Sequence, residues 1–389
     1  METVILIAAA GILAIVVLTA ADLFFGIRSM TELHGVEPAL ELHLPRISVI
    51  MPACNEEQHI EQAVKAQLRQ DYPNLEILVV DDRSTDATTD ILAELQKRYT
   101  SLKVIRIDTL PPGWMGKSHA LQQGAEAAGG EYLLFTDGDV SMEESTISRA
   151  AAHMKAQRLD HISLIFRNIS SGRLLNALIL DSGIGLLQVF RPWRARRKDT
   201  RAFVGVGAFN LVKQEVYHAL GGHRSIRMHP VDDLMLGKII KRASYRQECL
   251  LGMDLVTLPW YAGVAQMVDG LMKNAMAFIN FRYSLLPPLL AGLILLNILP
   301  FWGMIFADTI PQLLFSAVIA TKMTVSAYGT RKLGVSLWCA PATLLTPYIS
   351  VYIVLRAAWR NHRDGGIYWR GTFYPLQELQ KNEAVLPWL

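Results

Sequence analysis

Apolar segments near both ends of the chain constrain its fold more than any other feature. Residues 4–27 contain one charge, Asp22, in a run long enough to cross the roughly 30 Å hydrocarbon core of a bilayer. The chain begins Met1-Glu2, without the basic start of a signal peptide, and the run is too long for a cleaved one, so we expect an uncleaved anchor. Three more apolar stretches follow near the other end, at 285–307, 309–329 and 333–355.

These segments divide the 389 residues into five parts. We expect, in order, a transmembrane anchor at 1–27, a globular domain at 28–260, an interfacial amphipathic helix at 261–284, membrane helices at 285–356 and a basic, aromatic tail at 357–389. The chain is 51% apolar and 19% charged, which excludes disorder. Its 38 Lys and Arg nearly balance 35 Asp and Glu, which argues against a nucleic-acid partner.

Strand and helix patterns alternate within the globular part. Short apolar runs predict strands at 47–51, 76–80, 102–107 and 131–136. Asn55 can cap the helix that follows the first strand, and another helix is expected at 117–128. This alternation predicts an α/β fold with a mostly parallel sheet and helices on both faces. Ligands of such sheets bind at the carboxyl ends of the strands.

Acidic residues occur where a ligand is expected. Asp82 follows the second strand, and Asp137 and Asp139 follow the fourth. Alternate residues of an extended chain point to the same side, so an Asp-x-Asp can direct two carboxylates at one cation. Mg²⁺ or Mn²⁺ suits such a pair, because these ions bind one or two carboxylates together with substrate phosphates. An ordinary Asp-Gly turn is the alternative interpretation.

A third acidic pair, Asp232 and Asp233, precedes an apolar helical pattern. Asp232 can act as the N-cap of that helix. A cap does not require the second carboxylate, which leaves Asp233 as a candidate for chemistry.

The order of these motifs resembles glycosyltransferase family 2, whose members have a GT-A fold. The motifs are P-x-x-N-E at 52–56, VVDDRSTD at 79–86, GWMGKSHALQQGA at 113–125, LLFTDGDV at 133–140, GVGAFNLV at 205–212 and the acidic pair before L-x-L-G. They cover the whole globular part and are similar to the membrane-anchored branch with carotenoid (diaponeurosporenoate) and hopanoid-associated enzymes. The tail resembles that branch's W-K-G-R-x-Y ending, except that Thr372 replaces the second basic residue.

The resemblance implies that the globular part is a GT-A catalytic domain that binds a UDP-sugar. Pro52 and Glu56 would line the nucleoside pocket, and Asp82 would contact the base or ribose of a uridine nucleotide. Lys117 would approach the donor phosphates.

The remaining site residues would perform the transfer. Asp137 and Asp139 would meet the metal bound to the diphosphate, and Asp233 would be the general base, with Asp232 as its substitute. One base without a second nucleophilic carboxylate fits direct displacement, and hence inversion at the anomeric carbon. A catalytic domain fastened to a membrane suggests a lipid acceptor with a hydroxyl or carboxylate group.

Three other interpretations were weighed. Gly116-Lys117-Ser118 imitates an ATPase phosphate-binding loop, but Pro111 stands where that loop needs glycine. A processive polysaccharide synthase would have Q-x-x-R-W near 257–274, which this chain lacks. A non-enzymatic membrane protein that kept a nucleotide-binding fold would be expected to have lost an acidic pair, and all are present.

The expected location is the cytoplasmic membrane, crossed several times, with the catalytic domain in the cytosol because nucleotide sugars are cytosolic. Arg28, directly after the anchor, agrees with the positive-inside rule. Three crossings after residue 284 would place the basic tail outside, against that rule. We therefore predict a cytosolic tail and two effective crossings in the C-terminal bundle.

Overall fold

The computed structural model describes residues 2–38 and 44–387. The first residue of the expected anchor and the last two of the expected tail lie outside them. The chain forms two compact units. The helical unit comprises Met1–Ser29, Ser170–Arg191 and Tyr261–Ile367, and the α/β unit comprises Met30–Ile169, Pro192–Trp260 and Tyr368–Leu389. The expected range 28–260 is therefore interrupted by 170–191, and most of the tail groups with the α/β unit.

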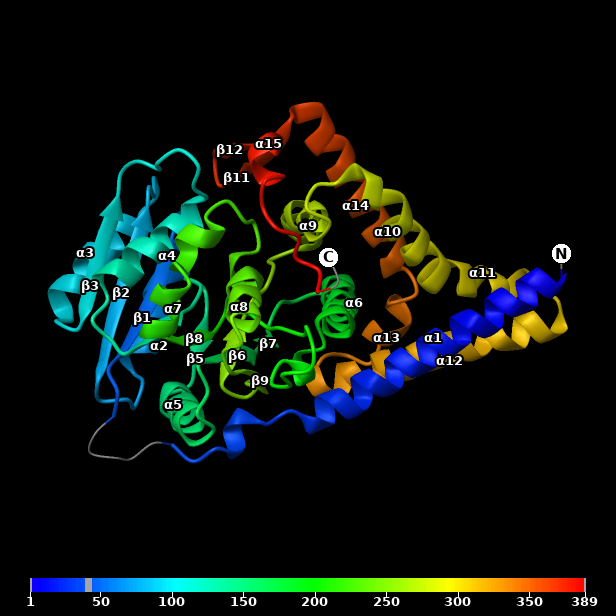
Figure 1. Ribbon diagram of the computed structural model, residues 1–389, viewed down its shortest axis with the longest axis horizontal. Coiled ribbons are helices and arrows are strands. Elements are labelled where there is room, and N and C mark those ends of the chain that lie inside the picture. Colours follow the sequence, from blue (N-terminus) through cyan, green and yellow to red (C-terminus); the bar gives the residue numbers. More distant parts are fainter. Residues whose placement is uncertain (1, 39–43, 388–389) are drawn as a thin grey trace. The chain divides into compact units, whose positions relative to one another are not determined.

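A seven-stranded sheet in the order β3-β2-β1-β4-β8-β6-β9 organises the α/β unit (Figure 1). The strands are β1 (Ile47–Ala53), β2 (Leu75–Asp82), β3 (Leu102–Ile107), β4 (Tyr132–Phe135), β6 (His161–Ile165), β8 (Asn210–Lys213) and β9 (Gln247–Leu251). Only β8 runs antiparallel to its described neighbours, β4 and β6. The predicted mostly parallel α/β sheet is confirmed, and β1 to β4 match the four expected strands.

Helices connect these strands. They are α2 (Ile60–Leu68), α3 (Thr88–Arg98), α4 (Gly116–Ala127), α5 (Thr146–Ala156), α7 (Gln214–Ala219) and α8 (Asp232–Arg242). A smaller sheet contains β5 (Ser141–Met142), β7 (Arg167–Asn168) and β10 (Val256–Leu258). The tail contributes the hairpin of β11 (Gly366–Trp369) and β12 (Thr372–Pro375), followed by α15 (Leu376–Leu379). The expected helix at 117–128 is α4.

Asn55 was wrongly predicted as a helix cap. Helix α2 begins five residues later, at Ile60, with His59 in the N-cap position. Asn55 instead takes a left-handed conformation with φ of 56°, and its Oδ1 accepts a hydrogen bond of 2.8 Å from the backbone N–H of Thr85. Asparagine tolerates this conformation better than most residues. The hydrogen bond of Asn55 therefore links the loop after β1 to the loop after β2.

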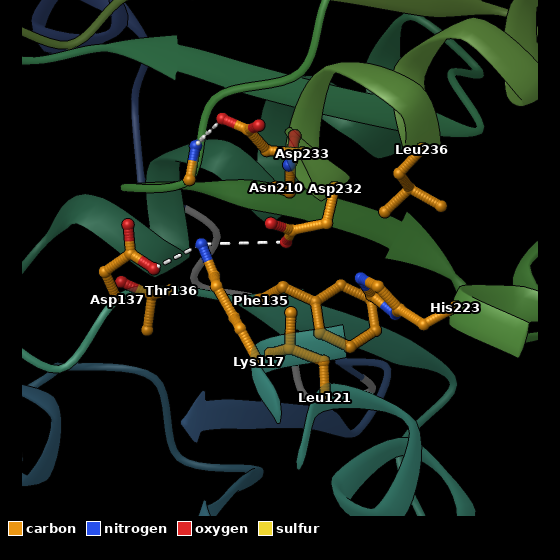
Figure 2. Close-up of a pocket in the computed structure, with 11 residues that line it drawn as sticks. Lys117, Leu121, Phe135, Thr136, Asp137, Asn210, His223, Asp232, Asp233 and Leu236 are labelled. Atoms are coloured by element: carbon orange, nitrogen blue, oxygen red, sulfur yellow. Dashed lines mark hydrogen bonds and ion pairs between the residues drawn. The ribbon is translucent and has the colours of Figure 1, made fainter. Parts of the chain in front are cut away.

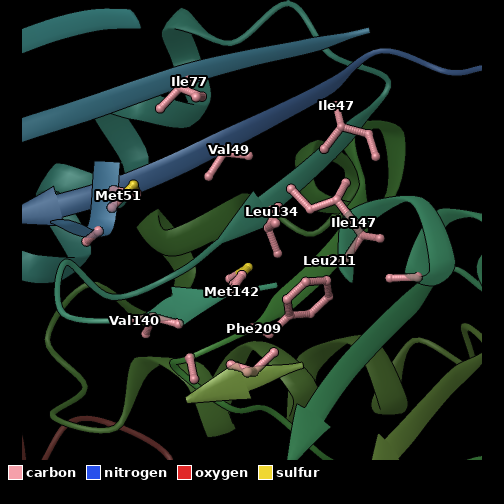
Figure 3. Close-up of a cluster of buried hydrophobic side chains, with 14 of the residues drawn as sticks. Ile47, Val49, Met51, Ile77, Leu134, Val140, Met142, Ile147, Phe209 and Leu211 are labelled. Atoms are coloured by element: carbon pink, nitrogen blue, oxygen red, sulfur yellow. The ribbon is translucent and has the colours of Figure 1, made fainter. Parts of the chain in front are cut away.

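The core of the α/β unit lies against the central strands (Figure 3). Side chains of β1, β2, β4 and β8, and of the residue just before β8, are fully or almost fully buried: Ile47, Val49, Met51, Ile77, Leu134, Leu211 and Phe209. Ile147 of α5 packs in the same cluster. Truncating one such residue, for example Leu134 to Ala, costs about 2–5 kcal/mol in closely packed cores. This burial makes the strands a rigid support for the loops at their ends.

The helical unit contains the apolar segments. Its helices are α1 (Glu2–Ser29), α6 (Arg173–Phe190), α9 (Val264–Phe278), α10 (Leu286–Leu293), α11 (Leu299–Phe306), α12 (Thr309–Leu333), α13 (Cys339–Ala342) and α14 (Thr346–Asp364). Helices α1 and α12 lie side by side (Figure 1). Ile12 and Val16 pack in one cluster with Phe315 and Val318. Helix α9 lies within the segment expected to be an amphipathic helix, 261–284.

Four helices of the described chain are long and apolar enough to cross a membrane: Glu2–Ser29, Arg173–Arg194, Tyr283–Phe306 and Thr309–Leu333. Three of them match expected apolar stretches. The stretch 333–355 is not a single helix, because the chain leaves α12 at Gly334 with φ of 67° and re-forms helices only at α13 and α14. Helix α6 was not expected, because Asp181 interrupts its apolar run.

Candidate active site

A pocket at the carboxyl end of β4 gathers a lysine and several carboxylates (Figure 2). Lys117 comes from the first turn of α4, and Asp137 from the loop after β4. Asp232 and Asp233 open helix α8. Four of the eight site residues predicted from the sequence thus line one pocket, although 116 residues separate Lys117 from Asp233.

Lys117 lies between two of these acids. Its Nζ is 2.7 Å from Oδ1 of Asp137 and 3.6 Å from Oδ2 of Asp232 (Figure 2). Burial disfavours the charged amine, but the surrounding carboxylates of Asp137, Asp232 and Asp233 outweigh it and raise the pKa of Lys117. The lysine is therefore held as a fixed positive charge, suited to an anionic ligand.

Gly207 connects the loop after β4 with the start of α8. Its backbone N–H donates to Oδ2 of Asp233 at 2.9 Å, and its carbonyl accepts from the backbone N–H of Asp137 at 3.2 Å. A Cβ at this position would lie 2.7 Å from Oδ2 of Asp137, closer than real Cβ contacts. A larger residue here would therefore displace the carboxylate of Asp137 from its present position.

Asp233 has the character of a proton acceptor. Burial and the neighbouring carboxylate of Asp232 raise its pKa to about 6, although Lys117 opposes this shift. A base with a pKa near the working pH can be ionised and still take up a proton in the transition state. Asp232 is not the N-cap that its position suggested: Val231 occupies that position, and Asp232 lies in the first turn.

The turn after β4 brings Asp139 close to the end of β1. At Gly138, between Asp137 and Asp139, an added Cβ would lie 3.2 Å from the Pro52 carbonyl oxygen and 3.8 Å from Cγ of Glu56. Burial, together with the negative charges of Asp137 and Glu56, raises the pKa of Asp139 to about 7. The turn thus concentrates negative charge.

The donor set at this turn fits a divalent cation that shares its coordination with a substrate. No cluster of three or more His, Cys, Asp or Glu side chains that could hold a metal occurs within residues 2–38 and 44–387. Asp137 and Asp139 supply hard oxygen ligands, and Mg²⁺ or Mn²⁺ commonly takes its remaining ligands from water and phosphate. A bound cation would also relieve the repulsion among these carboxylates.

The two acids at the end of β2 differ in their surroundings, which the sequence did not reveal. Asp81 is fully buried, and its Oδ2 accepts hydrogen bonds of 2.6 Å from both Arg106 and Thr89. Asp82 is held by the adjacent Arg83 through two hydrogen bonds, of 2.7 and 3.0 Å. A Cβ on Gly116 would lie 2.3 Å from Oδ2 of Asp82, so Asp82 adjoins the start of α4. Asp81 is a structural residue, and Asp82 borders the site.

The resemblance of the tail to the family's W-K-G-R-x-Y ending suggests a place near the active site, but it does not name the contacts that the tail makes. Arg370 donates a hydrogen bond of 2.7 Å to Oε1 of Glu56, and the hydroxyl of Tyr374 accepts one of 3.2 Å from the Gly116 backbone N–H. The aromatic runs around Arg370-Gly371 form a recognisable hairpin pattern. That pattern does not identify which distant loops the hairpin contacts.

Comparison with known proteins relates this geometry to a family. Residues 48–221 match the family model described as glycosyl transferase family 2. A 4,4'-diaponeurosporenoate glycosyltransferase of Staphylococcus aureus (strain USA300) is 23% identical over 363 residues, which cover 86% of this chain and 89% of the relative.

Among solved structures, a mannosyltransferase from Pyrobaculum calidifontis, in complex with GDP-Man and Mn²⁺, aligns with a TM-score of 0.52 and 18% identity. The alignment covers 92% of this chain and 99% of the other. At this level of identity the likeness concerns the fold, and the fold is of the GT-A type.

Proposed function

We propose, from the premise that this chain is a glycosyltransferase with a family 2 domain, that it transfers a sugar from a UDP-sugar to a lipid-type acceptor. The observation that carries the proposal is the position of Lys117 between Asp137 and Asp232, with Asp233 in the same pocket. In this pocket the charged amine of Lys117 faces the diphosphate of the donor. The carboxylate of Asp233, whose pKa is raised, lies in the same pocket.

The donor is expected to occupy the loops after β1, β2 and β4. In this proposal Pro52, Glu56 and Asp82 line the nucleoside pocket, and Lys117 contacts the phosphates. Asp137 and Asp139 hold Mg²⁺ or Mn²⁺, which supplies positive charge to the leaving diphosphate. The related structure with GDP-Man and Mn²⁺ shares the GT-A fold, which makes guanosine nucleotides the first alternative donors to test.

Asp233 is proposed as the general base. It removes the proton from the attacking hydroxyl while the bond between the sugar and the diphosphate breaks, so one carboxylate is enough for a direct displacement with inversion. The hydrogen bond from the Gly207 backbone N–H to Oδ2 helps to fix the orientation of this carboxylate.

A lipid acceptor is supported by two observations. The Staphylococcus aureus relative is named for 4,4'-diaponeurosporenoate, and four helices of this chain have the length and apolarity of membrane spans. A carboxylate acceptor would attack already ionised, whereas a hydroxyl acceptor needs the base.

Chain connectivity supports a topology with three crossings. The chain leaves the α/β unit after Trp260 and returns to it at Tyr368, so it must cross a membrane an even number of times in between. Tyr283–Phe306 and Thr309–Leu333 supply two crossings. Strand β6 precedes α6 in the chain and β8 follows it, and the two strands pair with each other. Both ends of α6 must therefore lie on the same side of the membrane, so α6 is not a single crossing. Helix α1 is the third crossing. Because nucleotide sugars are cytosolic, the α/β unit and the tail lie in the cytosol in this topology.

The function is tested with the full chain in lipid nanodiscs, Mn²⁺, a panel of UDP- and GDP-sugars and a lipid extract. Mass spectrometry is expected to find lipids that have gained one sugar, with release of the matching nucleoside diphosphate. Products with many added sugars would indicate a polysaccharide synthase instead. No nucleotide release with any donor would support a non-enzymatic protein.

A further inference from the structure

The hairpin of β11 and β12 contacts three loops that carry proposed donor-binding residues. At its tip, Arg370 donates 2.6 and 2.7 Å hydrogen bonds to the carbonyl oxygen of Cys54 and to Oε1 of Glu56, in the loop after β1. Thr372 accepts one of 3.2 Å from Arg83, the partner of Asp82 after β2.

The same hairpin reaches the start of α4. The hydroxyl of Tyr374, a residue only 3% exposed, accepts a hydrogen bond of 3.2 Å from the Gly116 backbone N–H, next to Lys117. One short segment near the end of the chain is thus bonded to the loops of Glu56, Asp82 and Lys117.

The backbone at the hairpin tip is unusual. Arg370 and Gly371 have φ values of 45° and 77°, as in a two-residue turn whose first position favours asparagine or glycine. An arginine with positive φ is uncommon, and such residues persist where their surroundings hold them. The turn alone does not explain an arginine here, whereas its two hydrogen bonds to the β1 loop do.

The charges give Arg370 a specific role. Glu56 lies next to the acidic turn proposed to receive a metal and a diphosphate, because a Cβ added at Gly138, between Asp137 and Asp139, would lie 3.8 Å from Cγ of Glu56. The guanidinium of Arg370 neutralises Glu56 and fixes its loop through a second bond to the backbone. Without Arg370, an uncompensated carboxylate would face the incoming diphosphate.

We propose that Arg370 is a positioning residue of the donor site, which acts through Glu56 to admit and orient a nucleoside diphosphate. This inference rests on the proposed function. It assigns the tail hairpin as a wall of the nucleotide pocket, with a role in donor binding and none in the proton transfer assigned to Asp233.

The choice of variant separates this role from a merely structural one. Arg370→Asn suits the turn better than arginine, so the hairpin should keep or gain stability while the guanidinium is lost. Arg370→Lys keeps a charge but cannot make the paired contacts. Glu383→Ala is the control, since Glu383 pairs with Arg242 at the other end of the tail.

The experiment measures the dissociation constants of UDP and GDP, each with Mn²⁺, on the full chain in detergent micelles. Arg370→Asn is expected to raise the dissociation constant of the nucleotide that the wild type binds by roughly tenfold to a hundredfold. A loss of this size is typical when a charge-assisted hydrogen bond is removed. Its melting temperature should not fall. Arg370→Lys should bind with intermediate strength, and Glu383→Ala like the wild type.

Two results would overturn the inference alone. One is a dissociation constant of Arg370→Asn for the nucleotide that lies within about twofold of the wild-type value. The other is full additivity of Arg370→Asn with Glu56→Gln, because an effect that passes through Glu56 must shrink once that carboxylate is gone. A wild type that binds neither nucleotide would instead refute the proposed function, and the inference with it.

Discussion

The backbone N–H of Gly207 lies 2.9 Å from Oδ2 of Asp233 and donates a hydrogen bond to it. Through its carbonyl, the same residue accepts a hydrogen bond from the backbone N–H of Asp137, so one glycine contacts both the proposed base and the backbone of a proposed metal ligand. Gly207 therefore links the carboxylate of Asp233 to the backbone of the loop that carries Asp137.

A methyl group at this glycine should disturb the site without unfolding the domain. In Gly207→Ala the new Cβ would lie 2.7 Å from Oδ2 of Asp137 and force that carboxylate to move. We expect transfer to fall by ~10²-fold, as for other small misplacements of reacting groups, with an unchanged melting temperature. Gly35→Ala is the matched control, because a Cβ there meets nothing within 4 Å. Equal losses in both variants would contradict this prediction.

Removing the proposed base should affect turnover more than binding. Asp233→Asn keeps the acceptor oxygen for Gly207 but cannot take up a proton. Donor hydrolysis, in which water is the nucleophile, should fall by ~10²–10⁴-fold while nucleotide affinity is largely retained. Asp232→Asn should be milder. If Asp233→Asn lost affinity but not turnover, Asp233 would be a binding residue.

The pH dependence follows from the raised pKa of Asp233. Only the ionised carboxylate accepts a proton, and with a pKa of about 6 its protonated fraction grows as the pH falls through that value. Turnover should be full above this pH and fall about tenfold per pH unit well below it. The profile is recorded at saturating Mn²⁺, so that protonation of Asp139 does not limit the rate. The residual activity of Asp233→Asn should not show this fall at low pH. If the fall persisted in that variant, a group other than Asp233 would be responsible for it.

Loss of one proposed metal ligand should remove the response to divalent cations. Asp139→Ala leaves Asp137 without its partner, so Mn²⁺ should no longer stimulate transfer, while circular dichroism should show a folded domain. Asp71→Ala removes an exposed carboxylate and should behave like the wild type. Full stimulation by Mn²⁺ in Asp139→Ala would rule out this ligand assignment.

Membrane topology can be tested with single cysteines in intact cells. Val385 is fully buried, so the exposed Lys381 is the better position in the tail. Lys381→Cys and Lys97→Cys should react with a membrane-impermeant maleimide only after permeabilisation, whereas Glu2→Cys should react directly. Of the native cysteines, Cys249 and Cys339 are buried, and Cys54 is replaced by serine in all variants. Labelling of Lys381→Cys but not of Lys97→Cys in intact cells would restore a third C-terminal crossing.

The first half of the α/β unit could be predicted because its signals are local. Strands β1 to β4 are short apolar runs, and Asp82, Asp137 and Asp139 stand at or directly after their ends. Local sequence alone made Asn55 resemble a helix cap, whereas its Oδ1 accepts a hydrogen bond from the backbone N–H of Thr85 in the next loop.

What the sequence could not reveal depends on distant contacts. Arg370 and Glu56 are 314 positions apart, and no periodicity links them. Helix α6 was missed because Asp181 breaks its apolar run, yet in the fold that carboxylate accepts a 2.8 Å hydrogen bond from Thr346. A polar residue with a partner elsewhere in the chain looks, in the sequence, like a residue exposed to water.

The tail hairpin also has a consequence for biosynthesis. The ribosome makes Glu56 and Lys117 long before Arg370 and Tyr374, and the helices 283–306 and 309–333 must emerge in between. A nascent chain can therefore fold its central sheet early, but it lacks the hairpin contacts until those helices have been translated. Nucleotide affinity that appears only at that stage would confine activity to chains whose membrane helices have been made, next to the proposed lipid acceptor.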